Sequence, residues 1–540
     1  MMIMKESNVK HWITFGLLLL SLLLLAVLSF SSQDRNRFSD LLVSSDEFQR
    51  IKESRSSQDD PFLTDLRFNN SSLFFDERTS AWFYSVSRDD PDTDPSVGYE
   101  GISGDRKLAF TGALIPGQTV SLLAYNDTEY REYQLVITTL PLIRIECDED
   151  GFPPSEKEQE YHVRFTMIDN RSSDHPAVIQ SDGRMHIRGH GSATYEKKAY
   201  RLSLYERAGD KTEHENKTSL LGLRADGDWL LYPGYNDQEK IRNVFSSNLW
   251  LASCGSDNSF GLKIGNEYRY VELFLNRQYW GLYALGYPID TEQMRIFPNM
   301  KGEYKEFLFK QTRWGPEEGS VTANDDGLEI QSDVKKSDEE FGYSVLKMYF
   351  DYLDAGAVYG LAHNDADNPI DIWLFLKLIQ ADDSVGTGRR TVNNFFYTIK
   401  SSDEGRKILY TPWDMDRSWG NTVDLSVHNT TGAYALSPDN DQYEMIFNPV
   451  SVMLRSGNDE IAGRIRARYE ALRKDLWSDE KIGIMLDGFE WDIFGTGAYL
   501  REMDRWPDGS YIEDPSLGLS LFRAYVLARF HSMDIYIAGL

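Results

Sequence analysis

Two short segments carry carboxylates that could bind a metal ion together with a phosphorylated substrate. Asp414 and Asp416 are two positions apart, so they share one face of an extended chain, and their oxygens suit Mg²⁺ or Mn²⁺. Asp382 and Asp383 stand at the C-terminal end of an expected helix, where the helix dipole disfavours negative charge. Carboxylates there need a compensating cation or a functional reason. For Asp414 and Asp416, a solvated pair beside Arg417 remains the alternative.

A glycine-containing turn and the strand after it could supply matching cationic groups. Gly189, Gly191 and Ser192 lie in the turn, where backbone N–H groups could approach an anion closely. In the following strand, Lys198 shares a face with two apolar residues, because alternate residues of a strand point to the same side. We expect such a lysine to point into a protected site. An ordinary turn and a lysine that only covers apolar surface are the alternatives.

Other catalytic classes lack their signatures in this sequence. It contains no HExxH helix, no GxSxG nucleophile elbow and no GxxxxGK phosphate loop. Two cysteines, Cys147 and Cys254, are too few for a disulfide framework or a four-cysteine zinc site, although one bridge remains possible. Zinc-hydrolase and serine-hydrolase functions are therefore disfavoured.

Length and charge narrow the class of protein further. A chain of 540 residues is too long for one ordinary core and indicates two or three domains. The formal net charge is −28, from 57 basic and 85 acidic side chains. Nucleic acid would be repelled by such a chain, so no nucleic-acid partner is expected. Nucleotide binding stays possible, since it requires only a few local cations and a metal ion.

The N-terminus has the pattern of a membrane anchor. An uncharged, leucine-rich stretch runs from Trp12 to Phe30 and approaches the roughly 20 residues of a membrane-spanning helix. Lys5 and Lys10 precede it, which favours a cytoplasmic N-terminus and an extracytoplasmic remainder. Ser29 and Ser31 have the spacing of a cleavage site, so a removed signal peptide, giving a secreted protein, is the alternative. Either interpretation predicts export.

Periodicity predicts an α+β protein in four parts. Residues 1–31 form the cytoplasmic stub and anchor, and residues 32–60 a polar tether. Short alternating runs in 61–139 predict a β-sandwich-like accessory module. Residues 140–540 are β-rich at first and helical later, which indicates two lobes with a cleft between them. The expected helices cover 239–251, a segment from about 337, Ile370 to Gln380 after Asn368-Pro369, 459–477 and 519–537.

Five blocks in sequence order carry a resemblance to a known family. They are RGHGSATYEKKAYRLSL (188–204), LLGLRADGDWLLYPGYNDQEKIRN (220–243), YVELFLNRQYWGLYAL (270–285), NNFFY (393–397) and PWDMDRSWG (412–420). Together they resemble the CotH family of spore-coat-type secretory protein kinases, over about residues 140–540. The resemblance implies an atypical, two-lobed kinase-like fold that binds ATP with Mg²⁺ or Mn²⁺. It also implies phosphorylation of Ser or Thr in a secreted, surface or coat protein.

The resemblance also implies roles for individual residues. Lys198 resembles the lysine that pairs with the ATP phosphates, and Lys197 is the adjacent candidate. Asp383 resembles the aspartate that orients or deprotonates the acceptor hydroxyl. The further matches are Asn394 and Asp414 as metal ligands, Asp416 as an additional carboxylate for metal, and Gly191, Ser192 and Arg242 on the nucleotide side.

The chain departs from the family pattern at two places. Gly286-Tyr287 stands where members commonly have a Thr-Glu pair, next to the expected nucleotide position. The stretch between Asp383 and Asn394 is also longer than usual. A catalytically inactive member that serves as a surface or coat assembly scaffold is therefore the alternative to a kinase. Transfer of a nucleotide rather than a phosphate is a third possibility.

Overall fold

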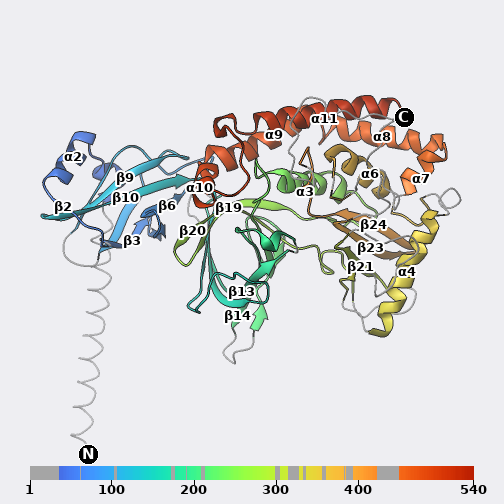
Figure 1. Cartoon of the computed structure of the whole chain (residues 1–540), viewed down its shortest axis with the longest axis horizontal. Coiled ribbons are helices and arrows are strands. Elements are labelled where there is room, and N and C mark those ends of the chain that lie inside the picture. Colours follow the sequence, from blue (N-terminus) through green and yellow to red (C-terminus); the bar gives the residue numbers. More distant parts are fainter. Residues whose placement is uncertain are drawn as a thin grey trace, which may run out of the picture.

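The computed structural model describes residues 36–60, 62–101, 106–171, 177–189, 191–207, 213–297, 305–313, 327–332, 336–354, 361–365, 367–381, 383–384, 393–421 and 449–540. It confirms the α+β class (Figure 1). The expected anchor lies outside the described residues. Within the described residues, no helix combines the length and the apolar character needed to cross a bilayer.

The first described part is a β-module made of two sheets with a common core. One sheet has the order β1 (Asn36–Arg37), β7 (Ser96–Gly101), β3 (Leu63–Phe68), β4 (Ser71–Ser72). The other has the order β5 (Phe74–Asp76), β6 (Ala81–Ser85), β10 (Glu129–Thr138), β9 (Thr119–Tyr125), β8 (Lys107–Phe110), with β2 (Ser56–Ser57) beside β10. Side chains such as Leu66 and Leu135 from the two sheets are buried in one cluster. The apolar runs in the sequence predicted β6, β8, β9 and β10 of this module correctly, whereas β3 and β7 were not predicted.

Residues 36–60 do not form the tether that the sequence predicted. They include β1, a 3₁₀ turn (Phe38–Leu41), helix α2 (Ser45–Glu53) and β2. Phe38 is buried in the core of the module, and Phe48 and Ile51 pack against β8 and β9. The polar composition hid a short amphipathic helix, because only one narrow face of α2 is apolar.

The next part is a β-barrel. Its sheet has the order β13 (Ala177–Arg188), β12 (Glu160–Asp169), β11 (Leu142–Glu146), β19 (Tyr268–Leu275), β20 (Gln278–Gly286), β18 (Asp228–Tyr232), β14 (Ala199–Arg207), β15 (Glu213–Glu215). The sheet closes because β13 pairs with β12 on one side and with β14 on the other. A small hairpin of β16 (Thr218–Ser219) and β17 (Ala225–Asp226) lies between β15 and β18 in the sequence.

Alternation along each barrel strand separates an inner from an outer face. Tyr200 and Leu202 of β14 belong to the core inside the barrel. On the outside, Leu230 of β18 packs with the helices of the second lobe. At another part of the outer surface, Phe274 of β19 contacts Phe83 of the β-module, with ring centroids 4.9 Å apart. The barrel therefore joins the module to the second lobe.

The second lobe contains a sheet as well as the expected helices. The order of its antiparallel strands is β22 (Leu328–Ile330), β21 (Phe307–Gln311), β23 (Phe395–Ser402), β24 (Gly405–Pro412). The helices are α3 (Arg242–Ala252), α4 (Lys336–Asp354), α6 (Asn368–Ile379), α7 (Pro449–Arg455), α8 (Asp459–Lys474), α9 (Asp479–Glu490), α10 (Ala498–Arg505) and α11 (Ser520–Ala538). Helices α8, α9 and α11 lie along one side of the molecule, above α3 and α6 (Figure 1).

Helix α6 is the central element of this lobe. Every residue of α6 is buried, which explains its apolar sequence, and Pro369 occupies its first turn. It contacts β24, α8 and α11. The helix ends at Gln380, which has a left-handed φ of 54°. This ending turns the chain so that Asp383 approaches the start of β23.

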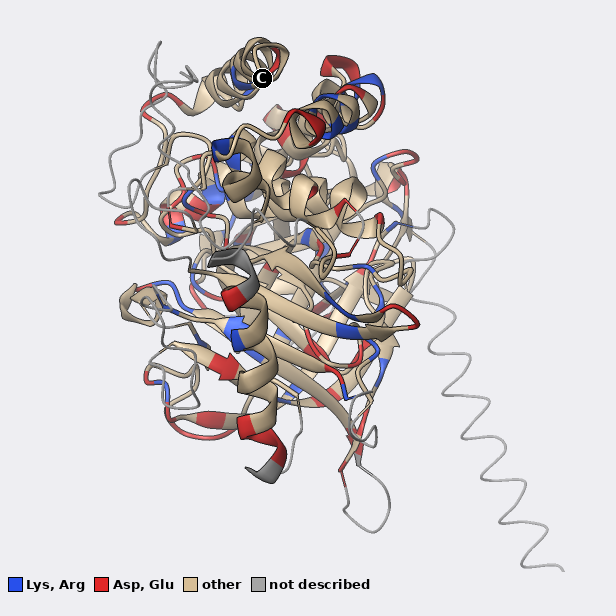
Figure 2. Cartoon of the chain, turned by 90° about the vertical axis from the view of Figure 1, so that its right-hand side faces the viewer, with Lys and Arg blue, Asp and Glu red and all other residues tan. Residues whose placement is uncertain are grey.

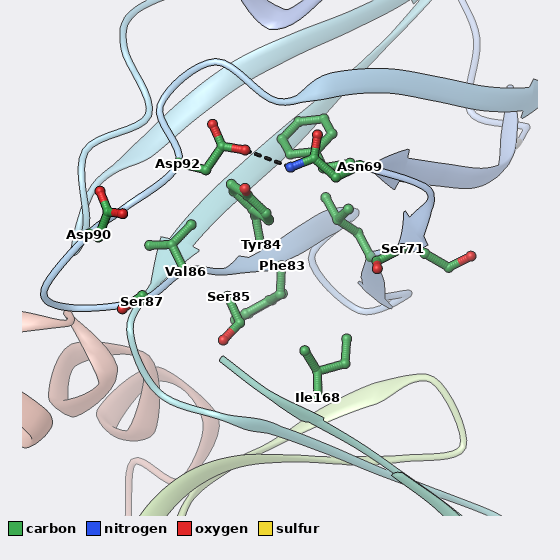
Figure 3. Close-up of a pocket in the computed structure, with 13 residues that line it drawn as sticks. Asn69, Ser71, Phe83, Tyr84, Ser85, Val86, Ser87, Asp90, Asp92 and Ile168 are labelled. Carbon is green, nitrogen blue, oxygen red and sulfur yellow. Dashed lines mark hydrogen bonds between the residues drawn. The ribbon is translucent and has the colours of Figure 1, made fainter. Parts of the chain in front are cut away.

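Charge and cavities add two observations. Acidic positions are spread over strands, helices and loops and are interspersed with basic ones (Figure 2). A cavity of about 40 Å³ is lined by residues of the β-module, including those of β6, and by Ile168 of the barrel strand β12. At its edge, Asn69 donates a hydrogen bond of 2.5 Å to Asp92 (Figure 3). The cavity is far too small for a nucleotide.

Cys147 and Cys254 are both buried and unpaired, so they form no bridge.

Candidate active site

A cleft of about 550 Å³ lies between the barrel and the sheet of the second lobe, within the size range of small-molecule sites. The barrel contributes the ends of β13 and β14, and the segment after β20 forms a further wall. The second lobe contributes β21, β22 and the end of the β23–β24 hairpin. The lining residues that carry charge are Lys157, Arg188, Arg201, Asp290, Lys310, Arg313, Glu329 and Asp414.

Three cations meet on the basic side of the cleft. Arg201 lies on β14 between Tyr200 and Leu202, so strand alternation turns it outward, toward the cleft. Arg188 ends β13, and Lys310 lies on β21 across the cleft. Burial lowers the pKa of Lys310, and the charges of Arg188 and Arg201 lower that pKa further. Arg201 is paired with Asp228 at 2.5 Å, whereas Arg188 and Lys310 form no ion pair with a carboxylate among the described residues. Cations that lie close together with this little compensation favour binding of an anion.

An aromatic ring holds two of these cations in place. The indole of Trp413 has the Arg188 guanidinium 5.5 Å and the Lys310 ammonium 5.4 Å from its ring centroid. Phe396 packs edge-on against Trp413 at 5.6 Å. Cation–π attraction of this kind orients the cations without neutralising them. Their charge therefore remains available to a ligand.

The β23–β24 hairpin places Asn394 and Asp414 side by side. Phe395 at the start of β23 pairs with Pro412 at the end of β24, so the residues just outside this pair are neighbours. The backbone N–H of Trp413 donates to the carbonyl oxygen of Asn394 at 2.9 Å. Asn394 and Asp414 both have a left-handed φ of 55°, and both line the cleft. The sequence predicted these two residues for one site, and the structure brings them together.

Asp383 lies one hydrogen bond away from the cleft. The Asn394 side-chain amide donates to Asp383 at 3.0 Å, and the Asn393 amide donates at 3.4 Å. Burial raises the pKa of Asp383 to about 6, and the nearby charge of Asp414 contributes to the rise. A carboxylate with this pKa accepts a proton near neutral pH more readily than an ordinary aspartate does.

Asp416 belongs to the same group of carboxylates. The Asn236 amide donates to Asp416 at 2.8 Å. Burial raises the pKa of Asp416 to about 7, with Asp414 as the next cause and Asp383 as a smaller one. The spacing of Asp414 and Asp416 predicted that they share one face of an extended strand, and this prediction is wrong. They lie in the segment after β24 instead, where the charge of Asp414 still contributes to the raised pKa of Asp416.

The model of the CotH kinase protein family matches residues 185–516, which is more than half of the chain and includes both walls of the cleft. The chain belongs to the CotH kinase protein family. No curated protein matches it.

The donor atoms at this CotH site fit a hard divalent cation. Asp383, Asp414 and Asp416 offer carboxylate oxygens, and Asn394 offers an amide, the ligand types that Mg²⁺ and Mn²⁺ prefer. The buried Oδ1 of Asn393 has no hydrogen-bond partner among the described residues. Within that part of the chain, no three His, Cys, Asp or Glu side chains are close enough together to enclose a metal ion. The fit therefore rests on the chemistry of the donors.

Lys198 and Lys197 do not line the CotH cleft. The ammonium group of Lys198 donates to the carbonyl oxygen of Ala193 at 2.9 Å. Lys197 is fully buried and bonds to Glu502 of α10 at 2.6 Å and to two backbone carbonyls. Lys198 was expected to share a strand face with Tyr200, but β14 begins only at Ala199, and the face that carries Tyr200 points into the barrel. The assignment of Lys198 to ATP phosphates stays a prediction.

The remaining nucleotide-side residues also lie outside the cleft. Gly191 and Ser192 form a 3₁₀ turn (Gly191–Thr194) beside Gly189, and only Gly189 lines the cleft. Arg242 begins α3, is fully buried, and forms ion pairs with Asp237 and Glu239. Its position indicates a structural role in fixing the start of α3. Asp382, the alternative to Asp383, lies outside the described residues.

Sequence reasoning missed Arg188, Arg201 and Lys310. Arg201 could have been found, because it alternates with two apolar residues and must face away from them. Lys310 gave no signal, since β21 was not recognised as a strand. Tyr287 was expected next to the nucleotide, but its ring is buried in the barrel core, with the Arg224 guanidinium 4.6 Å from its centroid. Tyr287 therefore does not narrow the cleft.

Proposed function

We propose that this CotH family member is a membrane-anchored, extracytoplasmic protein kinase that transfers the γ-phosphate of ATP to Ser or Thr of a surface or coat protein. The supporting observation is the interlobe cleft, in which Arg188, Arg201 and Lys310 face Asp414 and Asn394. A triphosphate needs cations along its oxygens and oxygen ligands for its metal ion, and this cleft has both.

The basic wall would bind the phosphates. Arg188 and Arg201 project from neighbouring barrel strands, and Lys310 approaches from the second lobe. Fixed cations in a partly buried cleft stabilise developing negative charge without reorganising during the reaction. Because the groups come from both lobes, phosphate binding would also hold the lobes at a fixed separation.

The acidic wall would bind the metal and position the acceptor. Asn394 and Asp414 would hold Mg²⁺ or Mn²⁺, with Asp416 nearby, and a divalent ion there would supply charge neutralisation for the phosphates. Asp383 would accept the proton of the substrate hydroxyl. Its two amide hydrogen bonds orient the carboxylate, and its pKa of about 6 suits proton transfer near neutral pH.

The test uses the full-length chain in detergent, ATP with Mg²⁺ or Mn²⁺, and an acidic or Ser-rich protein as acceptor. We expect transfer of the γ-phosphate, identified by mass spectrometry of the acceptor. Asp383→Asn should lower the rate about 100-fold or more, because the proton acceptor is lost while the shape remains. Asp403→Asn, at the exposed opposite end of the same hairpin, is the matched control. Transfer of the nucleotide, or equal rates in both variants, would contradict the proposal.

An inactive CotH scaffold for surface or coat assembly is the second candidate. One observation favours it: Lys198 bonds to a backbone carbonyl instead of facing the cleft. The scaffold predicts no change in melting temperature with ATP and metal, whereas a kinase that binds them is stabilised by mass action. A thermal-shift measurement separates the two.

A further inference from the structure

A second charged cavity lies where the β-module meets the rest of the molecule. Its volume is about 200 Å³, far more than the roughly 10–15 Å³ that one water molecule occupies. The loop after β6 contributes Arg88, the end of β12 contributes Arg171, and β19 contributes Arg269. Asp492 completes the wall from a π-helical segment (Trp491–Gly495) that follows α9. π-Helical turns are frequent at functional sites.

Asp492 is a carboxylate without a partner. Its side chain makes no hydrogen bond or ion pair with any residue that the structure describes. Burial raises its pKa to about 6, although the charges of Arg88 and Arg269 act in the opposite direction. These arginines therefore influence the carboxylate from across the cavity without contacting it. The space between them could hold a group that donates hydrogen bonds.

The arginines differ in how far their charge is already neutralised. Arg171 is bound by Asp169 through two hydrogen bonds of 2.8 and 2.6 Å, and Arg269 is bound by Glu267. Arg88 has no carboxylate partner among the described residues, and its guanidinium stacks on Trp491 at 5.2 Å. The cavity thus has Arg88 as an unneutralised cation and the half-buried Asp492 as a carboxylate without a partner on a different wall; Asp89, an exposed carboxylate next to Arg88 in the sequence, also lines it.

We propose that this cavity binds a small free zwitterion of the amino-acid class. Its ammonium group would contact Asp492, and its carboxylate would contact Arg88 and the remaining N–H groups of Arg269. The volume suits a molecule of this size, and each charged end meets an opposite charge. A purely anionic ligand would leave Asp492 without a partner, and a purely cationic ligand would approach Arg88 at a cost.

The site would couple ligand binding to the arrangement of the molecule. Trp491 of the π-helical segment donates to the hydroxyl of Thr139, at the junction between module and barrel, at 2.8 Å. Asn170, which follows β12 of the barrel, donates to the carbonyl oxygen of Val86 in the module and to that of Thr139 at the junction. A ligand held between Arg88 and Asp492 would therefore stabilise the docking of the module.

The experiment measures the melting temperature of the full-length chain with each of the twenty free L-amino acids, without ATP or metal. We expect at least one amino acid to raise it by about 2 °C or more at saturation. Acetate and ethylamine, which each carry one of the two charges, should leave it unchanged. Omitting ATP keeps the result independent of the proposed kinase activity.

Two variants test the contacts, with one control. Asp492→Asn keeps the shape of the side chain and should weaken binding at least about tenfold by calorimetry. Arg88→Gln, at an exposed position, should do the same if Asp492→Asn fails to fold. Asp487→Asn, on the exposed face of α9, should bind normally. No shift with any amino acid, an equal shift with acetate or ethylamine alone, or unchanged binding in both Asp492→Asn and Arg88→Gln would overturn the proposal.

Discussion

At the scale of the residue, Lys198 and Lys310 are alternative candidates for the lysine that pairs with the ATP phosphates. The family motif selects Lys198, whereas the geometry of the cleft selects Lys310. Lys198 already bonds to the carbonyl oxygen of Ala193, and Lys310 has a lowered pKa because it is buried beside two arginines. A phosphate group bound beside Lys310 would reduce the repulsion between its ammonium group and the two arginines. We therefore expect Lys310 to contribute more to phosphate binding than Lys198 does.

We expect Lys310→Met to raise the KM for ATP about tenfold, because one cation facing the phosphates is removed. Lys198→Met should change that KM less than about twofold. Steady-state kinetics of both variants in one assay make each the control for the other. The reverse outcome would restore the motif-based role of Lys198.

At the scale of the element, the turn after β24 depends on the start of α3. Asn236, before α3, donates to Asp416, and Asn243 of α3 accepts a hydrogen bond of 3.0 Å from the backbone of Met415. The turn that carries Asp414 is therefore held by the chain that leads from the barrel. Residues that orient metal ligands in this way commonly change metal affinity 10–100-fold when they are removed.

We expect Asn236→Ala to raise the Mg²⁺ or Mn²⁺ concentration at half-maximal activity about tenfold, because Asp416 loses its orienting hydrogen bond. Asn216→Ala, which removes a similar bond to Ser181 at the far side of the barrel, is the matched control. Titration of metal at saturating ATP measures the effect. Unchanged metal dependence in Asn236→Ala would show that Asp416 needs no support from α3.

The segment before α3 also contains a buried lysine, Lys240. Lys240 donates to the carbonyl oxygen of Ser510 at 2.7 Å and lies 4.2 Å from the ring centroid of Tyr511. Burial lowers its pKa from 10.5 to about 7. Between these values the unfolded chain binds the proton and the folded chain does not, so folding stability rises with pH. The cost of burying the charge is fully present below pH 7.

We therefore expect the wild-type chain to gain stability relative to Lys240→Met as pH increases from 7 to 9. The difference should grow by up to about 1.4 kcal/mol per pH unit. Melting temperatures of both proteins at pH 7, 8 and 9 provide the measurement. A constant difference across this range would mean that Lys240 keeps its proton when folded.

At the scale of the whole molecule, the β-module docks through a close backbone contact. Gly117 of the module has a φ of 82°, and a Cβ atom there would lie 2.2 Å from the carbonyl oxygen of Gly495. The contact joins the module to the π-helical segment between α9 and α10. Helix α10 in turn contacts β20 of the barrel, so three parts of the molecule meet in this region.

Gly117→Ala should lower the melting temperature by at least about 3 °C more than Gly112→Ala does, because the added methyl group separates the backbones at the junction. Gly112 has a nearly equal φ of 86°, but its Cβ would meet only Val120, at 3.4 Å. Both substitutions thus add a similar backbone strain, and only Gly117→Ala adds a steric clash. Scanning calorimetry measures the melting temperatures of both variants. Equal melting temperatures would mean that the backbones at the junction can move apart without loss of folding stability.

The sequence alone determined what depends on local pattern. The Asp382-Asp383 pair at a helix end and the Asp414/Asp416 spacing could be noticed from local pattern, and the family resemblance added Asn394 and favoured Asp383. The family followed from five such blocks, and the match over residues 185–516 confirms it.

Only the tertiary structure decided which side of each strand meets the cleft. The inside of the barrel exists because β13 pairs with β14, a contact that local periodicity does not contain. Lys310 reaches the site through the pairing of β21 with β23, across a long stretch of sequence. Alternation fixes which side chains share a face, but long-range pairing fixes what each face contacts. Lys310 therefore could not be chosen as a cation of the cleft before the sheets were assembled.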